Sequence, residues 1–359
     1  MKGRHATRGG CSVISFSIII RFDTPLFQGG PESQKPDPLG LLRGESLRGL
    51  MHTWARAIIA PLVGEGNIEA VKKAEQALFG YAAGERDEEV APPDPRDFGF
   101  ATFRMHDITL AEGDRPSLVE MGTASFPVCA HTDNPQRRGH PSSGAPRTVK
   151  VSFRRDAVKR DPDLPKMIWT VLWTALSLGS LGQRARRGYG SLTITDVTGL
   201  EKSVLGALTP YPGYASQDEV AAWIGAGFTQ AQANTRTWLE KNKTPLTASV
   251  RTDEHSFFQI GGCDQIRVGT PDQISANMRE GLLCNLMLAC RRARKDNSQE
   301  QYREFLGSHN PRRASPLWFR VFRLSDGRYV PVTVYSPPKK GISPIVNSVV
   351  NAIGINYPG

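Results

Sequence analysis

Residues 178-LGSLGQRARRGYGSL-192 form a glycine- and arginine-rich stretch between two elements of different periodicity. Before it, residues 166–178 place apolar side chains at the i, i+3/i+4 spacing of an α-helix. After it, residues 191–197 alternate and are rich in β-branched side chains, as in a strand. Glycine adopts positive φ and lets a backbone approach a ligand closely, and arginine offers forked donors to phosphate. The stretch is therefore a candidate loop for binding an anionic ligand.

Three ligand classes can use such a loop. A mononucleotide P-loop is excluded, because the lysine-serine/threonine ending is missing and the loop leaves a helix instead of entering one. A dinucleotide fingerprint fits poorly, because the order strand-loop-helix is reversed. A polynucleotide backbone fits better, since several closely spaced arginines accompany one stackable ring. A structural hairpin with solvated charges is the alternative.

The composition of the whole chain also favours a polyanionic partner. Its 359 residues suffice for about two domains. Lys and Arg number 45 against 35 Asp and Glu, a formal net charge of +10, although solubility alone would also account for this excess. The five cysteines are spread without a C-x-x-C motif, and no apolar run is long enough for a membrane span or resembles a signal peptide. We expect a cytoplasmic protein with no membrane contact.

The order of elements predicts an α+β fold. Strands are expected at 12–22, 99–110, 148–155 and 191–197, with helices at 45–60, 68–80 and 166–178. This is the split β-α-β order of a ferredoxin-like domain. We expect that domain over 11–197, a linker with a helical insertion over 198–249, and a second, related domain over 250–359. In the last two segments we expect helical pieces at 217–228 and 230–243, a strand or a short hairpin at 256–268, a helix at 274–295 and a hairpin at 317–336.

Two further segments carry candidate RNA-binding side chains. Arg48, His52 and Arg56 follow one another at i, i+4 and i+8 and form a polar stripe beside the apolar face of helix 45–60. A solvated helix edge is the simpler interpretation of that stripe. The long polar segment 131–147 contains Arg137 and Arg138 and is either a nucleic-acid-binding arm or a disordered excursion.

The sequence contains no recognisable catalytic constellation. Cys129, His131 and His140 match no standard zinc spacing, and no pair of carboxylates stands out, so we expect no metal and no cofactor. His52 is a candidate general base for RNA cleavage, but no partner that would orient it stands out. The residues alone indicate a binding protein and not an enzyme.

Motifs along most of the chain resemble the RAMP superfamily and, more closely, the first-subunit family of the Cmr effector complex of type III-B CRISPR systems. They are 24-TPLFQGG-30, 46-SLRGLMHTWARA-57, 77-ALFG-80, 179-GSLGQRARRGYGSL-192 and 312-RRASPLWFRV-321, in the family's order. Segments 131–147 and 198–247 match nothing in the family.

The resemblance implies two tandem ferredoxin-like domains and a non-catalytic subunit of an RNA-guided antiviral complex. Such a subunit holds the 3′ region of the guide RNA (crRNA) and the adjacent target RNA, beside neighbouring RAMP proteins. The RNA-binding residues that we expect are Arg48, His52, Arg56, Arg137, Arg138, Gly182, Gln183, Arg184, Arg186, Arg187, Gly188 and Tyr189.

Within this set, the three loop arginines would clamp phosphates and Tyr189 would stack on a base. Arg48 and Arg56 would flank the loop and line one positive cleft with it. Two other functions stay open: a metal-independent crRNA-processing endoribonuclease with His52 as its base, and a scaffold whose basic surface docks acidic neighbours.

Overall fold

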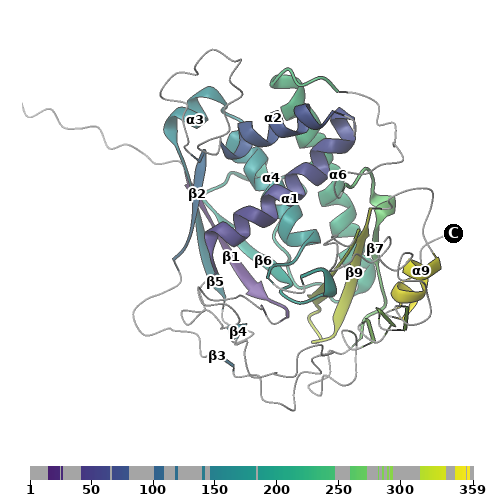
Figure 1. Cartoon of the computed structure of the whole chain (residues 1–359). Coiled ribbons are helices and arrows are strands. Elements are labelled where there is room, and N and C mark those ends of the chain that lie inside the picture. Colours follow the sequence, from purple (N-terminus) through teal and green to yellow (C-terminus); the bar gives the residue numbers. More distant parts are fainter. Residues whose placement is uncertain are drawn as a thin grey trace, which may run out of the picture.

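The first sheet combines four strands that lie far apart in the sequence (Figure 1). They are β1 (Ser15–Phe22), β2 (Phe103–Asp107), β5 (Arg147–Phe153) and β6 (Leu192–Thr198), and they pair antiparallel in the order β2-β5-β1-β6. The first and third of these strands along the chain are thus central in the sheet, and the ferredoxin-like arrangement predicted from the sequence is confirmed.

The computed structural model describes residues 15–24, 26, 42–64, 67–80, 101–108, 118–119, 140–141, 146–182, 185–246, 259–272, 316–336, 344–352 and 354–355, together with 282, 285, 286, 289, 290, 292 and 293. None of the helices in this part of the chain is long and apolar enough to cross a membrane.

Helices cover one face of this sheet. They are α1 (Gly44–Val63), α2 (Ile68–Phe79) and α4 (Leu164–Leu178), and α1 contacts both α2 and α4. Alternate residues of β1 point toward these helices and are buried: Phe16, Ile18, Ile20 and Phe22. Burial of apolar side chains at a period of two on the strand is the main stabilising contribution that the sequence pattern predicts.

The segment expected to be a linker is part of this core. One continuous helix, α6 (Gln217–Lys241), replaces the two pieces predicted at 217–228 and 230–243. It begins at a capping box formed by Ser216 and Glu219, and it packs on α4 and α1. The α4 contact is close at Gly227, where a Cβ atom would clash with the ring of Trp173. The absence of a side chain at this position therefore sets how closely the two helices approach.

Short elements were missed by the sequence analysis. They are β3 (Leu118–Val119), β4 (His140–Pro141), α3 (Arg155–Arg160) and α5 (Lys202–Leu205). Arg155 therefore begins a helix and does not end a strand as predicted. The apolar alternation that defines β5 stops at Phe153, which is its last buried residue.

The second sheet is smaller. It contains β7 (Ile266–Val268), β8 (Leu317–Arg323) and β9 (Tyr329–Tyr335) in the order β7-β9-β8. This is the first-third-second arrangement of a ferredoxin-like sheet without a fourth described strand. The predicted hairpin turn is present, with Gly327 at a φ of 88°. Of the strand predicted at 256–268, the described residues keep only β7, and a final helix, α9 (Pro344–Asn351), was not predicted.

Candidate nucleic-acid interface

The glycine-rich stretch forms a closed loop between the end of α4 and the start of β6. Gly182, Gly188 and Gly190 have φ angles of 81°, 83° and 64°, in the left-handed region that glycine adopts without strain. The amide of Leu181 donates to the carbonyl of Gly190 across 2.9 Å and closes the loop at its base. A Cβ atom at Gly190 would clash with the carbonyl oxygen of Leu181, so only glycine fits there.

Hydrogen bonds from two hydroxyl groups fix the second half of the loop. Thr24 Oγ1 and Ser191 Oγ both donate to the carbonyl of Gly188, at 2.7 and 3.0 Å. The amide of Ser191 in turn donates to Thr24 Oγ1 at 2.9 Å. Thr24 lies in the first of the quoted family motifs, so this hydrogen-bond network joins two of those motifs. These bonds fix the backbone of residues 188–191, the part of the loop that leads into β6.

Arg186 is the loop arginine whose side chain the structure describes. It lies in a short 3-10 helix, Ala185–Arg187, and its guanidinium carbon is 4.6 Å from the centroid of the Trp318 ring on β8. Burial lowers the pKa of this guanidinium to about 10, so the group remains charged at neutral pH. The loop thus keeps a positive charge that is fixed by a cation–π contact with the second domain.

Tyr189 is buried, and the expectation of an exposed ring is wrong. Its side chain is 3% exposed and belongs to the core of the second domain, together with Phe319, Val321 and Leu286. A ring in this position anchors the loop to β8 and is not available to stack on a base. This contact could not be predicted from the loop residues, because the side chains that cover Tyr189 lie far later in the chain, at Leu286, Phe319 and Val321.

A buried arginine ties both ends of the loop to the second sheet. Arg320 on β8 is completely buried and donates to the carbonyls of Leu176, at the end of α4, and Leu192, at the start of β6, as well as to Thr193 Oγ1. Burial lowers its pKa to about 9, although the carboxylate of buried Asp23 opposes that shift. Sequence reasoning missed Arg320, although a lone cation inside the apolar run 317–322 was an available signal.

The stripe on α1 packs against α2. His52 Nδ1 lies 2.5 Å from Glu75 Oε1, and Arg56 donates from Nε to Glu75 Oε2 at 2.7 Å. Arg48 donates to the carbonyl of Phe79, and its guanidinium group lies over the Phe79 ring. The His52 ring stacks on the same ring, with 3.9 Å between the two centroids. Burial raises the pKa of the Glu75 carboxyl, but the hydrogen bonds and charges of His52 and Arg56 outweigh it and leave that pKa below its usual value.

This arrangement separates the stripe from the loop. The side of α1 that approaches the loop carries Trp54, whose ring packs on Trp318 and beside Gly179. His52 and Arg56 are each two residues from Trp54, about 200° around the helix. The expectation that the stripe and the loop line one positive cleft is therefore wrong, and so is the interpretation of the stripe as a simply solvated edge.

Several predicted residues lie outside the described residues. These are Arg137, Arg138, Gln183 and Arg184, and the side chain of Arg187. The possible metal ligands Cys129 and His131, and the side chain of His140, also lie outside them. Within the described part of the chain, no three His, Cys, Asp or Glu side chains are grouped as metal ligands would be.

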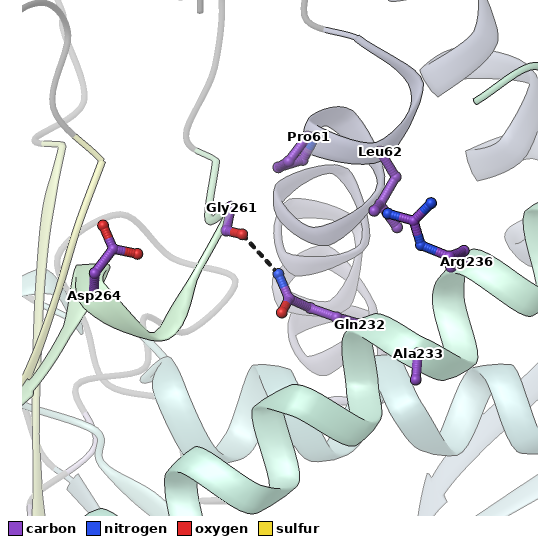
Figure 2. Close-up of a pocket in the computed structure, with 7 residues that line it drawn as sticks. All are labelled: Pro61, Leu62, Gln232, Ala233, Arg236, Gly261 and Asp264. Carbon is purple, nitrogen blue, oxygen red and sulfur yellow. Dashed lines mark hydrogen bonds between the residues drawn. The ribbon is translucent and has the colours of Figure 1, made fainter. Parts of the chain in front are cut away.

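A separate pocket of about 670 Å³ opens between the end of α1, helix α6 and the segment before β7 (Figure 2). Its lining residues are Pro61, Leu62, Gln232, Ala233, Arg236, Gly261 and Asp264. Gln232 donates to the carbonyl of Gly261 across 2.9 Å and links two walls. The single arginine of the pocket is accompanied by an aspartate, so the lining is not that of a phosphate site, and it contains none of the predicted RNA-binding residues.

Parts of this chain are similar to known proteins. The model of the RAMP superfamily matches residues 19–193, which contain β2 and β5, parts of β1 and β6, the stripe and the glycine-rich loop. The match makes this part of the chain similar to the RAMP superfamily. Among proteins with curated functions, none has a sequence that matches the chain.

Solved structures extend the likeness beyond the RAMP domain. The crystal structure of apo Cmr1 from Pyrococcus furiosus has 17% identity and a TM-score of 0.55, covering 94% of this chain and 95% of that one. A chain of the type III-B Cmr-beta complex bound to cognate target RNA has 12% identity and a TM-score of 0.62, with 95% and 100% covered. A second structure of that complex, with AMPPnP and in the presence of ssDNA, gives 14% identity and a TM-score of 0.60. At these identities the likeness establishes a shared fold for both domains.

Proposed function

We propose that this chain is a non-catalytic RNA-binding subunit of a type III-B CRISPR (Cmr) effector complex. In that role it holds the 3′ region of the crRNA and the adjacent target RNA, beside other Cmr subunits and in the cytoplasm. The observation that carries the proposal is a fold shared over 95% of this chain and the full length of a Cmr-beta chain. A likeness confined to the RAMP domain would leave the second domain unexplained.

The glycine-rich loop is the proposed RNA contact. Hydrogen bonds fix its base at Leu181 and Gly190 and its second half at Gly188, and a site that is ordered beforehand loses less conformational entropy when it binds phosphate. Arg186 supplies a permanent charge, and Arg184 and Arg187 flank it in the sequence. Because such contacts go to phosphate, they position RNA without reading its sequence.

The stripe on α1 and the arm keep a place in the proposal. Arg56 pairs with the carboxylate of Glu75, whereas Arg48 donates to the backbone carbonyls of Phe79 and Phe103. The Arg56 side chain is 47% exposed and its outer edge is available to a phosphate. Arg137 and Arg138 would add contacts from the 131–147 segment.

Ultraviolet crosslinking of the assembled complex with labelled crRNA, followed by peptide mapping, tests this proposal. We expect crosslinks in residues 182–187, near the crRNA 3′ end, and none at buried Tyr189. Crosslinks confined to 131–147 would refute the loop assignment. A complex that assembles fully while this subunit gives no crosslink would indicate a scaffold instead.

Salt dependence supplies a second, independent readout. The double variant Arg184→Ala, Arg187→Ala should reduce the slope of log affinity against log salt by about 1.4, because each lost phosphate contact with single-stranded RNA removes about 0.7. The matched control is Lys72→Ala, Lys202→Ala, which removes the same charge at exposed positions on α2 and α5. Equal slopes for the two variants would count against the loop.

One observation favours a second candidate function, an endoribonuclease. The orienting partner that the sequence did not reveal is present: Glu75 holds His52 Nδ1 at 2.5 Å. When Nδ1 donates this bond, the ring nitrogen on the other side is the basic one. Cleavage of repeat RNA by the purified chain in the presence of a chelator, lost in His52→Ala and reduced in Glu75→Gln, would establish this activity. RNA that stays intact would remove it.

A further inference from the structure

The face of the first sheet that points away from α1 and α4 carries a cluster of basic side chains. Along β2 the residues alternate between buried and exposed, and the exposed positions are Arg104 and His106. Along β5 the exposed position is Lys150. None of the three belongs to the glycine-rich loop or the α1 stripe. We call Arg104, His106 and Lys150 the sheet-face cluster.

The strand register brings the three side chains together. His106 on β2 pairs directly with Lys150 on β5, and Arg104 lies one ladder position along, opposite Ser152. Paired positions in neighbouring strands are about 5 Å apart, and alternate residues of one strand are about 7 Å apart. On the other side of β5, Lys150 pairs with Ser17 of β1, and Ser152 pairs with Ser15. Two cations, one imidazole and three half-exposed hydroxyl groups therefore occupy one small area.

The charges of the cluster are not neutralised within the described part of the chain, where none of its side chains takes part in a hydrogen bond or an ion pair. By contrast, Arg21 on the same face is engaged by Asp23 at 2.9 Å. The exposed acid of this face, Asp196, lies on β6 at the opposite edge, opposite Ile19 of β1. Positive charge is thus concentrated on the β2–β5 side of the sheet.

The chemistry of this face selects a phosphate backbone over a protein surface. A stable protein interface has an apolar, often aromatic, centre, and here the apolar residue is half-exposed Ile19 alone among the outward positions of β1, β2 and β5. Those positions contain no Phe, Tyr or Trp, so the imidazole of His106 is the one ring on them that can stack on a base. What remains is a set of cationic and hydroxyl donors, which suits phosphate and sugar oxygens.

We propose that the sheet-face cluster is a second RNA-binding site, which holds a single-stranded phosphate backbone without sequence preference. The choice of RNA rests on the proposed function, but the site is separate from the loop. The cluster lies on the outer face of the sheet, whereas the loop is anchored to β8 through Tyr189 and Arg320. Both sites together would let this subunit contact more of an RNA strand than the loop reaches alone.

The test measures binding of a labelled single-stranded RNA by the full chain at several salt concentrations. The variant is Arg104→Gln, Lys150→Gln, and the control is Lys72→Gln, Lys202→Gln; each removes two charges from exposed positions and from the formal net charge of +10. Loss of two contacts lowers the salt slope by about 1.4, and the same relation gives roughly 25-fold weaker binding at about 0.1 M salt. The loss should be equal for poly(U) and poly(A). Circular dichroism melting verifies that both variants fold.

The outcomes separate this inference from the proposed function. Wild-type protein that binds no RNA would overturn both. Wild-type binding that is weakened by Arg184→Ala, Arg187→Ala but equally strong in the sheet-face variant and its control would overturn the inference alone. Normal RNA binding by the sheet-face variant, with failure to copurify with neighbouring Cmr subunits, would show a protein interface and also overturn it. A strong preference for one homopolymer would exclude a backbone contact.

Discussion

Replacing Arg320 by methionine should destabilise the protein, because it removes the hydrogen bonds by which β8 holds the ends of α4 and β6. Methionine fills a similar volume but donates no hydrogen bond, so the carbonyls of Leu176 and Leu192 lose their guanidinium donors. A buried carbonyl without a partner costs roughly 1–3 kcal/mol, and removal of one member of a buried charged network costs about 3–5 kcal/mol. We therefore expect Arg320→Met to lower the free energy of unfolding by about 4 kcal/mol.

Urea unfolding followed by tryptophan fluorescence measures this change, because Trp54 and Trp318 pack on each other at the same junction. The matched control is Arg328→Met, in the turn of the same hairpin, where the arginine side chain is 48% exposed and pairs with Asp326. That variant should unfold at nearly the wild-type urea concentration. The unfolding midpoint of Arg320→Lys should lie between those of the two variants, since lysine keeps the charge but lacks the forked donors of the guanidinium group.

Hydrogen exchange tests the local consequence of the same substitution. The amide of Leu181 donates to the carbonyl of Gly190 within the loop, and the amide of Ser191 donates to Thr24 Oγ1 beside β1. If Arg320 fixes both ends of the loop, these amides should lose protection in Arg320→Met before the strands of the first sheet do. Stability within about 1 kcal/mol of wild type, with the two amides still protected, would refute the assigned role of Arg320.

Three further predictions concern packing and acid stability. Gly227→Ala should destabilise the protein by about 1–3 kcal/mol, because the added methyl group would overlap the ring of Trp173 on α4. Gly225→Ala on the same helix faces open space and should stabilise the protein by about 0.5–1 kcal/mol; thermal melts compare the two variants. Gly190→Ala should be more damaging than Gly213→Ala in the same assay, since both have positive φ but only the first also meets a backbone oxygen. The lowered pKa of Glu75 means that its contribution is complete above its usual value of 4.5 and is lost as pH falls through the lower folded-state value. Melting temperatures should therefore decline less steeply toward about pH 3 in Glu75→Gln than in wild type; parallel declines would contradict this.

The sequence predicted the elements whose own pattern determines them. The alternation in β1 and the apolar periodicity of α4 identify a strand and a helix without reference to the rest of the chain. The order of those elements then restricts the sheet to few topologies. Residue Gly80, at a φ of 87°, ends α2 as its type suggests. The hairpin turn at Asp326–Gly327 is equally local.

The sequence could not predict what covers a given face. Residues 48, 52 and 56 were correctly expected to share one edge of a helix, but their partner Glu75 lies on another helix. The two pieces predicted at 217–228 and 230–243 are one helix, which continues past Gly225 and Gly227 although glycine usually weakens a helix. Tertiary packing reverses that preference, since Gly227 is where α4 comes closest.

Tyr189 shows why a binding loop is hard to interpret from its own residues. An aromatic ring among arginines and glycines has the composition of an RNA-binding loop, and the same composition serves a loop that must be anchored from one side and open on the other. In this molecule the tyrosine ring points into the second domain, while Arg186 is held at the surface of that domain by Trp318. The second domain therefore contributes to the proposed RNA site without supplying a phosphate ligand, because it fixes the conformation in which the loop presents its donors. Substitutions on β8 should consequently impair RNA binding through the loop, at positions that no RNA contact map would identify.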